Sequence, residues 1–351
     1  MNFASDNAAG IAPAILDAIA AANHGSALAY GRDDLTARVS ERFCVVFGRD
    51  LAVFLVPTGT GANALALAHV SPPWGAVLCH AESHIITDEC GAPEFFGGGL
   101  KLIGLPGEAG KISLATLKEA LARGPWGGPH HVSASVLSLT QATEAGTVYR
   151  PDEIAALAAA AHAEGLSVHM DGARFANALA RLGVSPAEAT WKAGVDVLSL
   201  GATKAGALAA EAVVFFDPAR AAQMGERRKR GAQLVSKHRF IAAQFDAFFR
   251  DDLWLKLARH ANGQADRLAA ELSAIGCAPV WPVEANEVFA ALPRAADERL
   301  RAAGASYYPW SSQSLPKGMT IAEDRTLVRL VTSFATTDDE IAQFVGLVAK
   351  G

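Results

Sequence analysis

The chain has 351 residues, more than one hydrophobic core usually organises, which predicts two domains. Hydrophobic residues make up 51% of it and charged residues 19%, a balance typical of a well-packed soluble protein. The net charge of −5 argues against a general nucleic-acid-binding protein, and no apolar run approaches the roughly 18 residues that suggest a membrane span.

The cysteines and the first residues indicate a compartment. The four cysteines are widely spread and form no C-x-x-C pair: Cys44, Cys79, Cys90 and Cys277. This usage predicts a reduced, cytoplasmic chain. Residues Met1 to Asp6 contain no basic segment ahead of an apolar stretch, so we expect no signal peptide.

Apolar strand-like runs alternate with helical segments between residues 35 and 216. The predicted strands are 51–56, 75–80, 132–140, 166–171, a run from Val195 toward Lys204, and 211–216. The predicted helices are 59–70, 151–165 and 173–182. Such alternation predicts an α/β fold, a mostly parallel sheet covered by helices.

The pattern changes after residue 216. Residues 218–272 show helical patterning with many charges, and residues 276–348 mix short strands and helices. We therefore expect a large domain of residues 1–245 and a smaller C-terminal α+β domain of residues 246–351.

A glycine-rich turn, Pro57-Thr-Gly-Thr-Gly-Ala-Asn63, joins the first predicted strand to the first predicted helix. Free amides at a helix N-terminus attract phosphate, so Gly59 and Thr60 are candidate phosphate ligands. The spacing also fits the dinucleotide fingerprint G-x-G-x-x-A, with Glu82 about 20 residues on as a ribose-binding acid. A turn without a ligand is the third interpretation.

Asp171 and Arg174 follow the strand 166–171. A carboxylate at the carboxyl end of a parallel strand points into the crevice where such sheets bind ligands. Asp171 could instead cap the next helix. Arg174 could bind a carboxylate with its planar guanidinium, or lie on the surface.

Lys204 lies at the end of another apolar strand, among small residues that leave room for a planar ring: Gly201, Ala202, Ala205 and Gly206. A lysine whose aliphatic stem covers a strand end is the alternative. A strand-end Lys204 and a strand-end Asp171 together meet the needs of pyridoxal 5'-phosphate (PLP). That cofactor requires a lysine amine for covalent attachment and an acid beside its pyridine nitrogen.

Two further groups have more than one interpretation. His84 is a candidate for stacking on a cofactor ring and acting as a base, or it is structural. His80 and His84 leave a strand for a loop, where H-x-x-x-H suits a metal poorly, so we predict no metal site. The basic run 227–230 with Lys237 is a solvated helix face or a phosphate contact across a subunit interface.

The ordered set of motifs resembles the low-specificity L-threonine aldolases, which belong to the aspartate-aminotransferase-like fold-type I PLP enzymes. The resemblance covers nearly the whole chain. The motifs that carry it are Ser5-Asp6, Tyr30-Gly-Arg-Asp-Asp34, Pro57 to Asn63, Glu82-Ser-His84, His169 to Arg174, Thr203-Lys204 and Arg329-Leu-Val-Thr332.

The resemblance implies retro-aldol cleavage of β-hydroxy-α-amino acids, such as threonine and allo-threonine, to glycine and an aldehyde. It implies that Lys204 bonds to PLP, that Asp171 pairs with its ring nitrogen and that His84 stacks on the ring. Substrate contacts would come from Ser5, Tyr30, Arg174, Arg329 and either His130 or His131. The resemblance also implies a homotetramer, a dimer of dimers with sites at dimer interfaces.

The chain departs from the family pattern in one loop near the cofactor. Family members often carry Glu-Asn-Thr-His where this chain has Gln-Ala-Thr-Glu144. Substrates such as phenylserine, and the choice between threo and erythro isomers, therefore stay open. The alternatives to an aldolase are another fold-type I PLP lyase, acting by β-elimination or decarboxylation, and an NAD(P)-dependent oxidoreductase built on the glycine-rich turn.

Overall fold

The computed structural model describes residues 1–311, 315–316 and 318–350. Its strands are β1 (Ala52–Val56), β2 (Gly75–His80), β3 (Lys101–Leu105), β4 (Ser133–Thr140), β5 (Ser167–Gly172), β6 (Val197–Gly201), β7 (Glu211–Phe215), β8 (Glu287–Pro293), β9 (Tyr308–Pro309) and β10 (Arg325–Val331). The N-terminal helices are α1 (Pro13–Ala21), α2 (Asp34–Phe47), α3 (Gly59–Val70), α4 (His84–Thr87), α5 (Ala92–Phe96) and α6 (Leu114–Arg123). The later ones are α7 (Pro151–Ala163), α8 (Phe175–Leu182), α9 (Met224–Arg230), α10 (Arg239–Phe249), α11 (Leu253–Ala274), α12 (Arg294–Ala302) and α13 (Asp338–Ala349).

The large sheet contains the strands β1 to β7 in the spatial order β1-β7-β6-β5-β4-β2-β3. Pairing is parallel from β6 through β5, β4 and β2 to β3, whereas β7 is antiparallel to both β6 and β1. The prediction of a mostly parallel sheet is confirmed. The edge strand β3 was not predicted.

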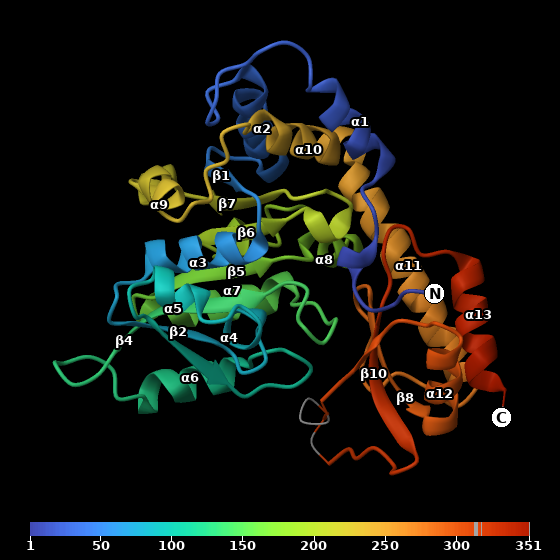
Figure 1. Ribbon diagram of the computed structural model, residues 1–351. Coiled ribbons are helices and arrows are strands. Elements are labelled where there is room, and N and C mark those ends of the chain that lie inside the picture. The colour runs from blue at the N-terminus through green and yellow to red at the C-terminus, as the bar shows by residue number, and fades with distance from the viewer. Residues whose placement is uncertain (312–314, 317, 351) are drawn as a thin grey trace.

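Helices cover both faces of the large sheet (Figure 1). Because successive strand residues point to opposite faces, neighbours in β4 join different clusters. Leu137 packs in the same cluster as Leu157 of α7, and Val136 in the same cluster as Leu67 of α3. The strands are therefore buried on both sides, as their continuous apolar sequence predicts.

Local signals set the ends of the helices around the large sheet. Thr58 caps α3, its hydroxyl accepting a hydrogen bond from the Gly61 amide. Helix α7 begins with Pro151 followed by two acids, whose charges suit the positive end of the helix dipole. These are the start positions that the sequence predicts.

The small sheet is antiparallel, in the order β8-β10-β9, and packs against α11, α12 and α13 (Figure 1). The long helix α11 contributes Ala258 to the cluster of the large sheet and Leu268 to that of the small sheet. Because α11 serves both clusters, the boundary near residue 245 stays a prediction.

The first residues of the chain join the small sheet. Phe3 is fully buried in its cluster, with its ring 5.1 Å from that of Phe344. The Phe3 amide donates to the Ser306 carbonyl, and the Phe3 carbonyl accepts from the Val331 amide, both at 2.8 Å. We call residues 2–8 the N-terminal strap, since they run from the small sheet to the ends of the large-sheet strands.

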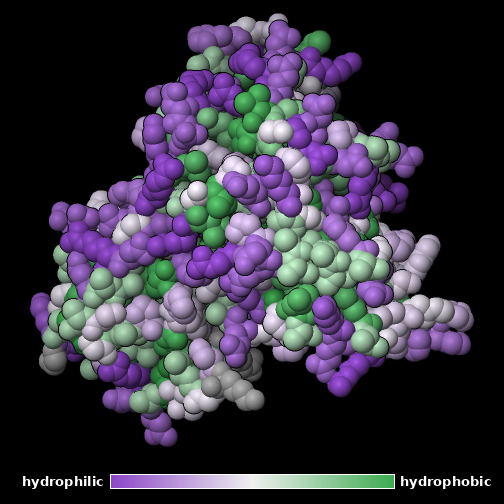
Figure 2. All heavy atoms as spheres, turned by 180° about the vertical axis from the view of Figure 1, so that it is seen from behind, coloured by the Kyte–Doolittle hydropathy of each residue, from purple (hydrophilic) through white to green (hydrophobic). Residues whose placement is uncertain are grey.

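The surface seen from behind is mostly hydrophilic, with hydrophobic residues in small groups between (Figure 2). Within the described part of the chain, no helix combines the length and apolar character needed to cross a bilayer.

Candidate active site

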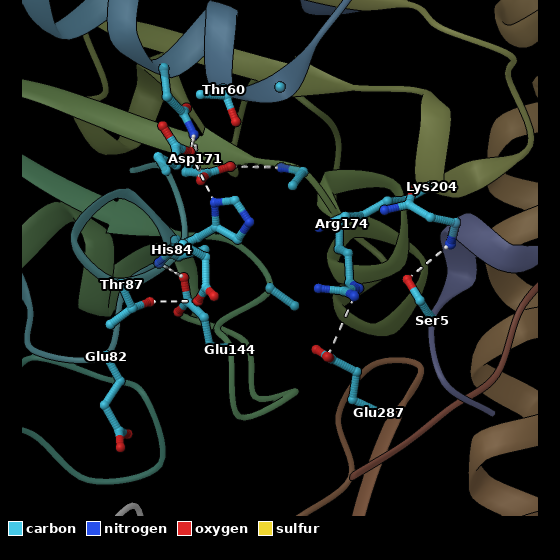
Figure 3. A pocket seen from close by; sticks show the side chains of 18 of the residues that line it. Ser5, Thr60, Glu82, His84, Thr87, Glu144, Asp171, Arg174, Lys204 and Glu287 are labelled. Carbon is cyan, nitrogen blue, oxygen red and sulfur yellow. Dashed lines mark hydrogen bonds and ion pairs between the residues drawn. The ribbon is translucent and has the colours of Figure 1, made fainter. Parts of the chain in front are cut away.

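A pocket of about 910 Å³ lies at the carboxyl ends of the large-sheet strands. One wall comes from the ends of β4, β5 and β6 and from the start of α3, and the other from the small sheet and the N-terminal strap. Side chains from the two walls, such as Arg174 and Glu287, point toward each other across this space (Figure 3). The fold therefore places the pocket where open α/β sheets bind ligands.

Asp171, at the end of β5, is held by hydrogen bonds on both carboxylate oxygens. Asn63 Nδ2 of α3 donates to Oδ2 at 2.8 Å, and the Ala173 amide donates to Oδ1 at 3.0 Å. Asn63 also donates to Glu89 Oε1 at 2.8 Å. These contacts fix the direction of a buried acid that lines the pocket.

Gly59 and Thr60 open helix α3 at the edge of the pocket. The first amides of a helix have no partner within the helix. Apart from its chain neighbours and the backbone of its own helix, no heavy atom lies within 4 Å of the position that a Cβ would take on Gly59, so the space in front of this backbone is open. The turn can receive a phosphate group.

Lys204 follows β6 in a short 3-10 helix, Thr203–Ala205, and lines the pocket. The end of β6 lies close to the loop after Asp171, because a Cβ on Gly201 would stand 2.7 Å from the Ala173 carbonyl oxygen. Glu211, the register partner of Gly201 on β7, lines the same part of the pocket. Burial raises the pKa of Glu211 to about 7.

His84 begins the short helix α4 and is held on two sides. Its Nδ1 lies 2.9 Å from Glu89 Oε1, and its backbone amide donates to Glu144 Oε1 at 2.7 Å. The hydrogen bond to Glu89 raises the pKa of His84, and burial raises the pKa of Glu89. Burial also raises the pKa of Glu144 to about 7. A proton can therefore reside in this group at neutral pH.

Arg174 forms a two-pronged ion pair with Asp6 of the N-terminal strap. Its Nε lies 2.8 Å from Asp6 Oδ2 and its Nη2 3.2 Å from Oδ1. Although burial works against ionisation, Arg174 and Lys204 hold the pKa of Asp6 below its ordinary value. The pair ties the strap to the loop after β5.

Arg329 comes from β10 on the small-sheet wall. Its guanidinium lies 4.9 Å from the centre of the Trp310 ring, and its Nη2 donates to the Ala4 carbonyl at 3.4 Å. Nη1 is 3.9 Å from Glu287 Oε1. The structure thus brings Arg329 and Arg174 to one pocket, although they are far apart in the sequence.

The structure gathers most of the predicted site residues but leaves some outside. Ser5, Gly59, Thr60, His84, Asp171, Arg174, Lys204 and Arg329 all line the pocket. Tyr30 does not: its amide donates to the Ser236 carbonyl at 2.9 Å, and its ring lies 4.8 Å from Lys229 Nζ. The run 227–230 on α9 also lies outside the lining.

His130 and His131 are exposed and do not reach the pocket of their own chain. They precede Ser133, where β4 begins, whereas Thr140 at the other end of β4 lines the pocket. The prediction that one of them contacts the substrate therefore gains no support from a single chain.

Several pocket residues received no role from the sequence. Five of them line the pocket directly: Asn63, Glu89, Glu144, Glu211 and Glu287. Asp6 is not part of the lining but pairs with Arg174, which is. For Glu287 the available signal was an acid at the start of an otherwise apolar strand. Among the described residues, no three or more His, Cys, Asp or Glu side chains group as metal ligands would.

Comparison with known proteins places this site in a family. The sequence profile described as "Beta-eliminating lyase" matches residues 2–295. The "Low specificity L-threonine aldolase" of Pseudomonas aeruginosa is 49% identical over 309 residues, which cover 87% of this chain and 88% of that protein. The protein of the same name from a second Pseudomonas strain is 45% identical over 308 residues, with the same coverage.

Solved structures agree with this match. The threonine aldolase of Leishmania major superposes with a TM-score of 0.91 at 28% identity, covering 99% of this chain and 98% of that one. A Sphingomonas wittichii serine palmitoyltransferase, at 16% identity and a TM-score of 0.72, shares the fold over 99% of this chain and 86% of its own. The expected fold type is confirmed. The chain belongs to the beta-eliminating lyase family and, within that family, to the low-specificity L-threonine aldolases.

Proposed function

We propose that this chain is a PLP-dependent aldolase that cleaves L-threonine, L-allo-threonine and related β-hydroxy-α-amino acids to glycine and an aldehyde. The observation that carries the proposal is the meeting of Lys204 and a doubly held Asp171 in one pocket of a chain 49% identical to a threonine aldolase. A nicotinamide oxidoreductase would leave both side chains without a role.

The residues present fit PLP. The open backbone at Gly59 suits its phosphate, Asp171 suits its ring nitrogen, and Lys204 supplies an amine. The volume of about 910 Å³ leaves room for an amino acid beside the cofactor. When bound, PLP withdraws electrons from the bonds to Cα of an attached amino acid.

The chain's own residues would bind and orient the substrate. Arg174 and Arg329 offer guanidinium groups for its carboxylate, and Ser5 of the N-terminal strap lines the same pocket. His84, held by Glu89, can accept the proton of the β-hydroxyl as the Cα–Cβ bond breaks. The hydrogen bond to Glu89 raises the pKa of His84 and so stabilises the protonated ring that results.

The test is product analysis on the purified holoenzyme. We expect glycine and acetaldehyde from threonine, with no ammonia or 2-oxo acid. Ammonia with a 2-oxo acid would instead indicate β-elimination, the alternative favoured by the description of the matching family.

Replacing the amine gives the matching variant test. Lys204→Ala is expected to abolish turnover while the fold stays intact, because no other lysine lines the pocket in the described chain. Lys118→Ala, at an exposed position on α6, is the control and should keep full activity. Glycine production by Lys204→Ala at a substantial fraction of the parent rate would contradict the assignment.

We also propose a cytoplasmic homotetramer arranged as a dimer of dimers. Support comes from the family resemblance, from four cysteines that form no disulfide and from large exposed apolar side chains such as Trp74 and Phe95. Sedimentation of the pure protein measures the state directly. A monomer at working concentration would remove this part of the proposal.

A further inference from the structure

Glu287 is a buried acid in the pocket wall, and no group among the residues that the structure describes donates a hydrogen bond to its carboxylate. It begins β8 and lines the pocket, yet its side chain has no exposed surface. Neither carboxylate oxygen has a hydrogen-bond partner in the described part of the chain. A buried carboxylate in this state is costly, which calls for an explanation.

The charges nearest to Glu287 are the two arginines proposed to bind the substrate carboxylate. Its Oε1 lies 3.5 Å from Arg174 Nη2 and 3.9 Å from Arg329 Nη1. Both distances are at or beyond the limit of a hydrogen bond, so the contacts are electrostatic and do not fix the position of the carboxylate. Glu287 points at Arg174 from the small-sheet wall (Figure 3).

Two acids already match the charges of the two arginines before substrate arrives. Arg174 and Arg329 carry two positive charges, and Asp6 and Glu287 carry two negative charges. Lys204 adds a weaker attraction from across the pocket. A substrate carboxylate would be a third acid beside two guanidinium groups.

We propose that Glu287 is an internal carboxylate that competes with the substrate carboxylate for Arg174 and Arg329, and that it takes up one proton when the substrate binds. The inference rests on the proposed function, in which those arginines bind the substrate. A protonated Glu287 removes one negative charge and gains an O–H that can donate to the incoming carboxylate.

The direction of the pH effect follows from this exchange. Burial raises the pKa of Glu287, which lowers the cost of protonation, while Arg174 and Arg329 oppose it. Glu144, itself buried, adds a negative charge that also acts on Arg174. Binding of a carboxylate is strongest below the pKa of Glu287 and weakens about tenfold per pH unit above it.

The experiment uses the holoenzyme and 3-hydroxybutyrate, which is threonine without its amino group and so reports on carboxylate binding without a covalent bond to the cofactor. Calorimetry in two buffers of different ionisation enthalpy at about pH 8 counts the protons exchanged. The parent enzyme should take up about one proton more than Glu287→Gln. Between about pH 6 and about pH 9 its inhibition constant should rise more steeply than that of Glu287→Gln, in which only the other pocket groups, Glu144, Glu211 and His84, still titrate.

Glu287→Gln should also bind 3-hydroxybutyrate at least about tenfold more tightly than the parent at the upper end of this range. In turnover, its KM for threonine should fall while kcat changes little. Glu298→Gln, the same change at an exposed position on α12, should behave like the parent.

Two results would overturn the inference. One is binding to the parent without proton uptake, which decides the matter even if Glu287→Gln does not fold. The other is weaker binding by Glu287→Gln, which would make Glu287 a positioning residue for the arginines. Glycine production from threonine is measured separately. An enzyme that makes glycine but takes up no proton on binding 3-hydroxybutyrate would therefore contradict only this inference and not the proposed function.

Discussion

The two walls of the pocket hold their charged groups in different ways. On what we call the cofactor wall, Asn63, Glu89, Asp171 and His84 are linked by contacts of 2.8 to 2.9 Å. What we call the carboxylate wall contains Arg174, Arg329 and Glu287. Asp6 holds Arg174 at 2.8 Å, but Glu287 stands 3.5 and 3.9 Å from the two arginines and hydrogen-bonds to neither. Short, shared hydrogen bonds fix a geometry, whereas longer electrostatic contacts leave room for a visiting group.

The difference matches two tasks. A cofactor that stays bound is served by a preorganised network, because orientation is set once. A substrate that enters and leaves in every turnover must displace whatever neutralises its binding groups. Changes on the cofactor wall should therefore act mainly on kcat, and changes on the carboxylate wall mainly on KM.

The largest effect is expected at Asp171. Asp171→Asn keeps the shape but removes the negative charge beside the ring nitrogen, and kcat should fall about a thousandfold. Steady-state kinetics with threonine and the visible spectrum of the bound cofactor measure this. Asp50→Asn, the same change at an exposed position, is the control. A loss confined to KM would break the division between the walls.

An intermediate effect is expected at Arg329. Arg329→Met removes one charged donor from the carboxylate wall, and KM for threonine should rise between about tenfold and about a hundredfold, because hydrogen bonds to charged groups are worth about 1.5–3 kcal/mol. The value of kcat should change far less. Arg294→Met, exposed at the start of α12, serves as control. An unaltered KM would show that Arg329 does not contact the substrate.

The smallest effect is expected at Glu89. Glu89→Gln keeps the shape beside His84 but replaces the carboxylate whose hydrogen bond, together with its charge, raises the pKa of His84. Since only unprotonated His84 can accept a proton, the acid limb of the kcat profile should move to lower pH, with less than about a tenfold change in rate at neutral pH. A profile that keeps its position would remove His84 as the titrating base.

Much of the large sheet could be predicted from sequence, because its buried parallel strands are continuous apolar runs. The strands ending near Asp171 and leading to Lys204 lie where expected. The strand β3 was missed since Lys101 and Gly104 interrupt its apolar pattern at the sheet edge. Strand β7 runs antiparallel to β6 because a short connection joins them, and no residue pattern predicted that direction.

The site residues, too, divide into those that a local sequence pattern predicts and those that it does not. Residues at strand ends, such as Asp171 and Lys204, are local signals, because the carboxyl edge of a parallel sheet gathers them. Asp6 and Glu287 could not be found this way, since their meaning depends on Arg174, which lies on a distant segment. Tyr30 belongs to a resembling motif, and the resemblance suggested His130 or His131, but in one chain all three lie outside the pocket lining.

The N-terminal strap also limits how far the two halves of the molecule can separate. Phe3 is paired with the small sheet, and Asp6 is paired with Arg174 at the edge of the large one. Three residues of extended backbone span about 10 Å at most. Any movement that takes these two anchor points further apart than that must first break the ion pair between Asp6 and Arg174 or release Phe3 from the small sheet. The N-terminal strap is thus a tether between the two sheets, and the number of residues between Phe3 and Asp6 sets its maximum length.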